Sequence, residues 1–195
     1  MRDDDPRPPA ATAAAAAPLV VRPADEADMP AVQAIYAHHV LTGLGSFEEV
    51  PPDLAEMAAR RTKALSRGLP YLVAGEGPVG RVVGYAYAAP FRDRPAYRYS
   101  VEDSVYVAPD AVGRGVGTAL LTELIARCEA LGYRQMIAVI GDSANVGSVG
   151  LHAKLGFAMA GRLIGVGFKF DRWVDSVYMR RPLGPGNGAP PAVGG

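Results

Sequence analysis

The middle of the chain alternates short runs of apolar residues with stretches in which apolar residues recur every three or four positions. The short runs are typical of strands, and the recurring pattern is typical of amphipathic helices. Strands are predicted at residues 19–21, 71–74, 79–89, 99–107, 136–140, 157–169 and 173–180. Helices are predicted at residues 28–40, 53–68, 118–131 and 144–155. This order predicts an α/β fold in which a mixed sheet carries helices on both faces.

The first two predicted helices each follow an aspartate. Asp28 and Asp53 stand directly before the periodic apolar residues, and we expect both to act as N-caps. The spacing in the second helix predicts one buried face, made of Leu54, Met57, Ala58 and Leu65.

The two ends of the chain differ in composition from the middle. Residues 1–18 contain seven Ala and four Pro, and residues 184–195 contain five Gly and three Pro. Segments of this kind bury too little apolar surface to offset the entropy of ordering, so we predict that both are disordered tails. The folded unit is then a single domain, residues 19–183.

Composition excludes several classes of protein. Lys plus Arg and Asp plus Glu both number 20, so no excess of positive charge favours nucleic acid. A single cysteine, Cys128, and three histidines make a metal site unexpected. The apolar run over residues 10–21 is too short to span a membrane, and the first residues are acidic rather than basic. We expect a cytoplasmic protein that binds neither nucleic acid nor membrane.

A glycine-rich turn joins the strand over 99–107 to the helix over 118–131. Gly113, Gly115 and Gly117 would let the backbone approach a ligand closely, and the helix would present free N–H groups to an anion. A plain strand-to-helix turn that requires glycine is the alternative. The turn lacks the Gly-Lys-Ser/Thr of a P-loop, and its mid-chain position fits a dinucleotide-binding fold poorly.

The turn resembles the acetyl-coenzyme A motif of the Gcn5-related N-acetyltransferases, which reads R/Q-x-x-G-x-G/A. Gly115 and Gly117 fill the glycine positions, whereas Val112 replaces the usual Arg or Gln and Arg114 is a candidate to compensate. The resemblance implies a mostly antiparallel sheet, with acetyl-coenzyme A as co-substrate and no metal. The coenzyme-binding residues that it implies are Val105, Tyr106, Val107, Gly113, Arg114, Gly115, Val116, Gly117, Thr118, Asn145 and Ser148.

Further motifs resemble the phosphinothricin and methionine sulfoximine N-acetyltransferase branch of this superfamily. They lie at residues 46–49, 84–92, 97–107, 138–145, 151–157 and 165–175. The branch implies acetylation of the α-amine of a small amino-acid-like molecule. It also implies a homodimer, for which the region of Trp173 offers apolar surface.

Glu102 is the candidate general base. Strand alternation places it on the face of Ser100, Ser104 and Tyr106, where it could take a proton from an attacking amine. The resemblance assigns it the same role, and a solvent-facing or salt-bridged carboxylate is the alternative. Asp103 belongs to the opposite face unless the strand contains a bulge, as the resemblance implies.

His152 and Asn145 are predicted on the helix over 144–155. Many members of the family have a tyrosine at the place of His152 that reprotonates the leaving thiolate, and a histidine could do the same. A buried structural histidine remains the alternative. Asn145 is expected to cap the helix and to contact the pantetheine arm, with Ser148 as a weaker contact.

A substrate that carries a carboxylate or phosphinate calls for cations. Arg92 and Arg94 lie shortly before Glu102 and suit bidentate contacts, although exposed loop arginines are the alternative. The residues predicted to bind substrate are Phe47, Arg92, Asp93, Arg94, Glu102, Asp103 and Ser104.

Two other functions stay open at this point. The first is acetylation of another amine, such as a polyamine, an aminoglycoside or a protein N-terminus. The second is a non-catalytic module that binds coenzyme A, because a fold does not fix a function.

Overall fold

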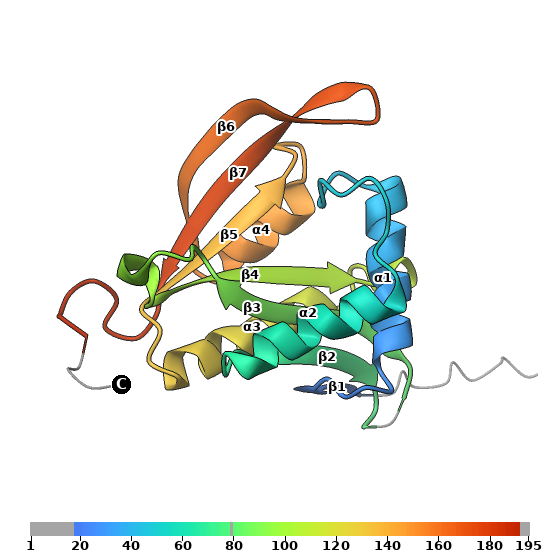
Figure 1. Cartoon of the computed structure of the whole chain (residues 1–195), viewed down its shortest axis with the longest axis horizontal. Helices are drawn as coiled ribbons and strands as arrows, with labels where there is room; N and C mark the ends of the chain where they lie inside the picture. Colours follow the sequence, from blue (N-terminus) through green and yellow to red (C-terminus); the bar gives the residue numbers. More distant parts are fainter. Residues whose placement is uncertain (1–17, 79, 192–195) are drawn as a thin grey trace, which may run out of the picture.

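The computed structural model of the chain describes residues 18–78 and 80–191, and the predictions for residues 1–17, 79 and 192–195 lie outside these ranges. Within these ranges, seven strands form one sheet in the order β1-β2-β3-β4-β5-β7-β6 (Figure 1). The strands are β1 (Leu19–Pro23), β2 (Tyr71–Glu76), β3 (Val82–Pro90), β4 (Ser100–Val107), β5 (Gln135–Gly141), β6 (Ala158–Lys169) and β7 (Arg172–Pro182). Among the strands of the described residues, only β4 and β5 pair in parallel, so the predicted mixed, mostly antiparallel sheet is confirmed.

The helices are divided between the two faces of the sheet. They are α1 (Met29–Thr42), α2 (Leu54–Ser66), α3 (Val116–Ala130) and α4 (Val146–Lys154). Tyr36 of α1 packs edge-on against Tyr106 of β4, with ring centroids 4.9 Å apart. Gly84 of β3 lies opposite Val107, one position along β4 from Tyr106. It faces Val116 and Leu120 of α3 instead. Because neighbouring positions point to opposite faces, α1 and α3 cover opposite faces of the sheet.

The second helix buries a narrower stripe than its apolar pattern predicts. Met57 and Ala64 are buried, but Leu54 and Leu65 are 47% and 42% exposed, so the predicted face is wrong in part. Arg61 lies between the two buried residues and donates from Nε and Nη2 to the Ala24 carbonyl. The helix therefore docks through a polar anchor as well as through apolar contact.

Asp28 occupies the predicted N-cap position of α1, but the expected hydrogen bond from its side chain to the helix is missing. Its side chain makes no cap hydrogen bond, whereas Asp53 accepts from the Glu56 N–H at 2.8 Å as predicted. Arg22 donates to both carboxylate oxygens of Asp28 at 2.6 and 2.7 Å. A bidentate arginine is a stronger partner than a backbone N–H, and it ties β1 to the start of α1.

The C-terminal segment, predicted as a disordered tail from residue 184, has defined positions as far as Pro191. It contains two hydrogen-bonded turns. In the first, the Gly186 N–H donates to the Leu183 carbonyl, and in the second, the Gly188 N–H donates to the Pro185 carbonyl. Arg134 donates to the carbonyls of Ala189 and Pro190. None of the helices in the described ranges is long and apolar enough to cross a membrane.

Candidate active site

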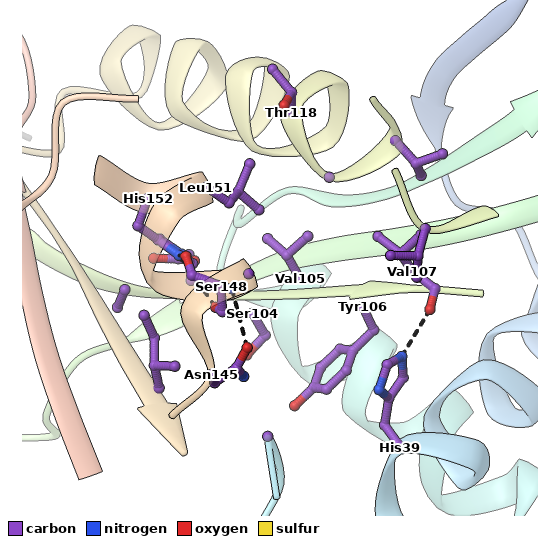
Figure 2. A pocket seen from close by; sticks show the side chains of 18 of the residues that line it. His39, Ser104, Val105, Tyr106, Val107, Thr118, Asn145, Ser148, Leu151 and His152 are labelled. Carbon is purple, nitrogen blue, oxygen red and sulfur yellow. Dashed lines mark hydrogen bonds and ion pairs between the residues drawn. The ribbon is translucent and has the colours of Figure 1, made fainter. Parts of the chain in front are cut away.

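A cavity of about 600 Å³ opens where β4 and β5 separate. Their ladder ends at Asp103 and Ala138, and the starts of α3 and α4 complete the walls (Figure 2). Ten of the eleven residues predicted to bind the coenzyme line it, and Arg114 does not. These ten are Val105, Tyr106, Val107, Gly113, Gly115, Val116, Gly117, Thr118, Asn145 and Ser148.

The glycine-rich turn forms a cradle at one end of the cavity. Gly113 and Gly115 have φ angles of 81° and 82°, a left-handed conformation that favours glycine. A Cβ on Gly117 would lie 3.0 Å from Cδ2 of Leu151, so the slot between α3 and α4 is narrow there. The first turn of α3 carries no acidic residue. Its free N–H groups and positive dipole end suit a phosphate or pyrophosphate.

Arg114 does not replace the charge missing at Val112. Its Nη2 donates to Oε1 of Glu76 in β2 at 2.7 Å. This hydrogen bond holds the Arg114 side chain outside the cavity lining. The Val112 side chain is 66% exposed. The cradle is therefore built from backbone groups, and neither Val112 nor Arg114 supplies it with a basic side chain.

Beyond Asp103, the edge of β4 that faces the cavity pairs with no other strand of residues 18–78 and 80–191. The Ala108 N–H donates to Val83 of β3 at 2.9 Å, so the Val107 carbonyl of the same trans peptide points to the other, open edge. Because peptide groups alternate along a strand, the N–H groups of Val105 and Val107 point to this edge as well. Such donors could bind an extended arm or polarise a carbonyl.

Asn145 caps α4 as predicted. Its Oδ1 accepts from the Ser148 N–H at 3.1 Å. The cap uses only the oxygen of the amide, which leaves Nδ2 as a donor. Asn145 also lines the second, smaller cavity beside Gly43 and Phe170.

His152 and Asp103 form a buried pair on the α3/α4 side of the sheet. Nε2 of His152 lies 2.9 Å from Oδ2 of Asp103, and Nδ1 lies 2.7 Å from the Ser148 carbonyl. The two side chains are only 4% and 2% exposed. Burial alone would lower the pKa of His152, but the hydrogen bond and charge of Asp103 raise it above the usual value. Both ring nitrogens are thus engaged.

The bulge that the family resemblance implies is absent from the ladder between β3 and β4. That ladder runs without a register shift from Gly84 opposite Val107 to Pro90 opposite Val101. Asp103 nevertheless lines the cavity, because the cavity opens on its side of the sheet. Ser104 lines it too, at the point where the strands part.

Glu102 lies on the opposite face of β4 and does not line this cavity. Its side chain is half-buried and forms no hydrogen bond or ion pair with a residue of 18–78 or 80–191, so the salt-bridged alternative does not hold there. Burial and the nearby negative charge of Asp103 raise the pKa of Glu102, and Arg92 partly offsets this. A raised pKa brings a carboxylate closer to the range in which it can take and release a proton near neutral pH.

The remaining predicted substrate residues lie outside the cavity lining. Arg92, Asp93 and Arg94 are exposed in the β3–β4 connection, and neither arginine forms an ion pair with a described residue. The Arg92 guanidinium lies 5.0 Å from the centre of the Phe91 ring. The Phe47 ring, 42% exposed, stands against Gly167 of β6 and Gly141 of β5.

Sequence reasoning missed several residues of the cavity wall, among them His39, Gly45 and Leu151. His39 comes from α1, on the other side of the sheet from α3 and α4. It lies one turn beyond Tyr36 on α1, but no motif or spacing in the sequence marks it as a wall of the cavity. No group of three His, Cys, Asp or Glu side chains that could hold a metal occurs in the described ranges.

The comparisons with known proteins agree with the fold and the cradle. The model of the acetyltransferase (GNAT) family matches residues 33–157, more than half of the chain, and the chain belongs to this family. It is 59% identical to a phosphinothricin N-acetyltransferase of Alcaligenes faecalis, over 86% of this chain and 84% of that protein. It is 41% identical to an L-methionine sulfoximine/L-methionine sulfone acetyltransferase of Pseudomonas paraeruginosa, over 87% of this chain and 98% of that protein.

A solved structure matches closely as well. It is a phosphinothricin acetyltransferase of the GNAT superfamily from Sinorhizobium meliloti, in complex with acetyl-coenzyme A. The TM-score is 0.86 at 48% identity, and the match covers 90% of this chain and 94% of that chain.

Proposed function

We propose that the protein is an acetyl-coenzyme A-dependent N-acetyltransferase that acts on the α-amine of a small amino-acid-like molecule, of the phosphinothricin, methionine sulfoximine or methionine sulfone type. The observation that carries the proposal is the environment of Glu102. This carboxylate has no partner in the described ranges and a raised pKa, and it stands where β4 and β5 separate. A salt-bridged structural carboxylate would have such a partner.

The cavity fits the coenzyme. The glycine cradle and the start of α3 would hold the pyrophosphate, and the open edge of β4 with Nδ2 of Asn145 would hold the pantetheine arm. When bound, acetyl-coenzyme A supplies an activated acetyl group. The N–H of Val105 would polarise the acetyl carbonyl, and preorganised backbone donors of this kind are effective where negative charge develops.

Glu102 and the buried pair have different tasks in this proposal. Glu102 takes a proton from the amine, directly or through one water, as a nitrogen–carbon bond replaces the carbon–sulfur bond. His152 holds Asp103 in place, because both of its nitrogens are engaged. In this proposal, water in the cavity and not His152 donates the proton to the leaving thiolate.

The arginines favour an anionic substrate. Arg92 is close enough to Glu102 to lower its pKa, and neither Arg92 nor Arg94 has a carboxylate partner in the described ranges. A free guanidinium suits the carboxylate or phosphinate of an amino-acid-like molecule. The same charges disfavour a polyamine or an aminoglycoside. A non-catalytic module would have no need of an unpaired Glu102.

An amine panel tests the proposal. Purified protein and acetyl-coenzyme A are incubated with phosphinothricin, methionine sulfoximine, methionine sulfone, spermidine, an aminoglycoside and an N-terminal alanine peptide, and the released thiol is measured. We expect turnover with at least one of the first three and little with the cationic amines. Turnover restricted to the peptide or to the cationic amines would contradict the substrate class. Absence of any turnover, with coenzyme binding intact, would favour a binding module.

A further inference from the structure

His39 contacts the open edge of β4 from the α1 side of the cavity. Its Nε2 lies 2.8 Å from the Val107 carbonyl oxygen (Figure 2). A carbonyl oxygen only accepts hydrogen bonds, so Nε2 carries the proton and donates. In the neutral ring, Nδ1 is then a lone-pair acceptor.

The environment of His39 favours this neutral form. Burial lowers its pKa below the usual value, the bond to Val107 offsets this in part, and the adjacent His38 lowers it further. Nδ1 has no hydrogen-bond partner in the described ranges. It faces the space beside the Tyr106 ring, whose centroid lies 5.4 Å from that of His39, and both residues line the cavity (Figure 2).

Two parts of the coenzyme could come near this position. The diphosphate offers only acceptors and negative charge, which a lone pair on Nδ1 would repel. The pantetheine arm offers amide N–H groups and a hydroxyl, which are donors. An acceptor in the wall therefore suits the arm and not the phosphate end.

We infer that His39 is a binding residue for the pantetheine arm: Nε2–H occupies the Val107 carbonyl while Nδ1 accepts a hydrogen bond from an N–H or O–H of the arm. This inference rests on the proposed use of acetyl-coenzyme A. By occupying the Val107 carbonyl, His39 removes an acceptor that would compete with Nδ1 for the same donor. The Val107 N–H points to the same edge.

Isothermal titration calorimetry of two ligands tests the contact. Coenzyme A contains the arm, whereas adenosine 3′,5′-bisphosphate contains only the nucleotide end. His39→Phe keeps a ring against Tyr106 but removes both nitrogens. His38→Ala is the matched control, since His38 is the next residue of α1, is exposed and lies outside the cavity lining.

For His39→Phe we expect the Kd of coenzyme A to rise about 3- to 10-fold, the range of one net hydrogen bond. The Kd of the bisphosphate and the thermal midpoint of the free protein should change little. His38→Ala should bind both ligands as the wild type does. In ¹⁵N NMR spectra, the His39 ring should stay in its Nε2–H form when coenzyme A binds.

Three results would overturn the inference. An unchanged Kd for coenzyme A would show that His39 does not contact the arm, and an equal loss for both ligands would show a structural role. A ring that becomes doubly protonated on binding would indicate a phosphate contact. Failure of the wild type to bind coenzyme A at all would instead overturn the proposed function, and this inference with it.

Discussion

Glu102 and Asp103 are adjacent in sequence and have opposite environments, because a strand turns alternate side chains to opposite faces. Asp103 is buried against His152 on the α3/α4 side, at an Oδ2–Nε2 distance of 2.9 Å. Glu102 stays half-buried and unpaired among the described residues on the other side. One carboxylate is thereby committed to a partner, and the other remains available for proton transfer.

The pair of Asp103 and His152 should give the protein a distinctive stability profile. The pKa of His152 is higher in the folded state than its unfolded value of about 6.5. Protonation of His152 therefore stabilises the folded state, and this contribution is fully present at pH values below about 6.5. This contribution is lost as pH rises through the higher, folded pKa. In urea unfolding at a series of pH values, wild type should exceed His152→Gln in stability most at pH 6. The gap should narrow toward pH 9, and a gap that widens with pH would contradict a protonated His152.

The residue scale also shows what a sequence can predict about the site. Parity along β4 correctly separated Glu102 from Asp103, because the ladder with β3 contains no register shift. The wall formed by His39 could not be predicted in this way. It depends on how α1 crosses the sheet, and no motif or spacing encodes that crossing. The hydrogen bond between Arg114 and Glu76 could not be predicted either, because it joins segments that are 38 residues apart.

At the scale of elements, Lys169 joins the β6–β7 hairpin to the end of α1. Its ammonium is buried and donates to the carbonyls of Val40, Gly43 and Ser46 at 2.7, 2.9 and 2.8 Å. Carbonyls at a helix C-terminus lack partners within the helix, and a lysine can satisfy them. The anchor also fixes the loop that carries Phe47.

Lys169→Met should therefore be strongly destabilising. Three carbonyls would lose a charged donor, at a cost of about 3 kcal/mol, since one hydrogen bond to a charged group contributes roughly 1.5–3 kcal/mol and several are not additive. For a chain of this length, that lowers the thermal midpoint by about 6–12 °C. Lys63→Met, at an exposed position of α2, is the control and should change little. Equal midpoints for the two variants would contradict the anchor.

Element types followed from periodicity, but element ends and buried faces followed less well. β2 extends to Glu76 and β3 begins at Val82, whereas the pattern placed their turn at residues 75–78. The pattern of α2 predicted Leu54 and Leu65 as buried. Hydrophobicity alone does not reveal that Arg61 anchors this helix through the Ala24 carbonyl.

At the scale of the whole molecule, the β6–β7 hairpin forms one border of the sheet, and β6 is the edge strand (Figure 1). Large apolar side chains are exposed along it, including Ile164 at 75%, Trp173 at 69% and Phe168 at 54%. An apolar edge strand is a liability unless something covers it. We propose that a second copy covers it, because a twofold axis lets the same edge meet itself.

Sedimentation equilibrium tests this dimer. At micromolar concentration we expect a mass of two subunits of 20.4 kDa, and Ile164→Asp should shift it toward one subunit. Leu131→Asp is the control, because Leu131 is 54% exposed just beyond α3 and should leave the mass unchanged. A wild-type mass of one subunit would contradict the dimer.

The rate of acetyl transfer by Glu102→Gln, measured against pH with the best substrate of the panel, tests the central claim most directly. Loss of a positioned base typically costs 10²–10⁴-fold, so the turnover number at pH 7 should fall by about that range. The defect should shrink as pH rises past about 8, where an α-amine loses its proton unaided. Coenzyme affinity should stay the same, since Glu102 lies outside the cavity lining. A variant within about threefold of wild type at pH 7 would contradict the claim that Glu102 is the base.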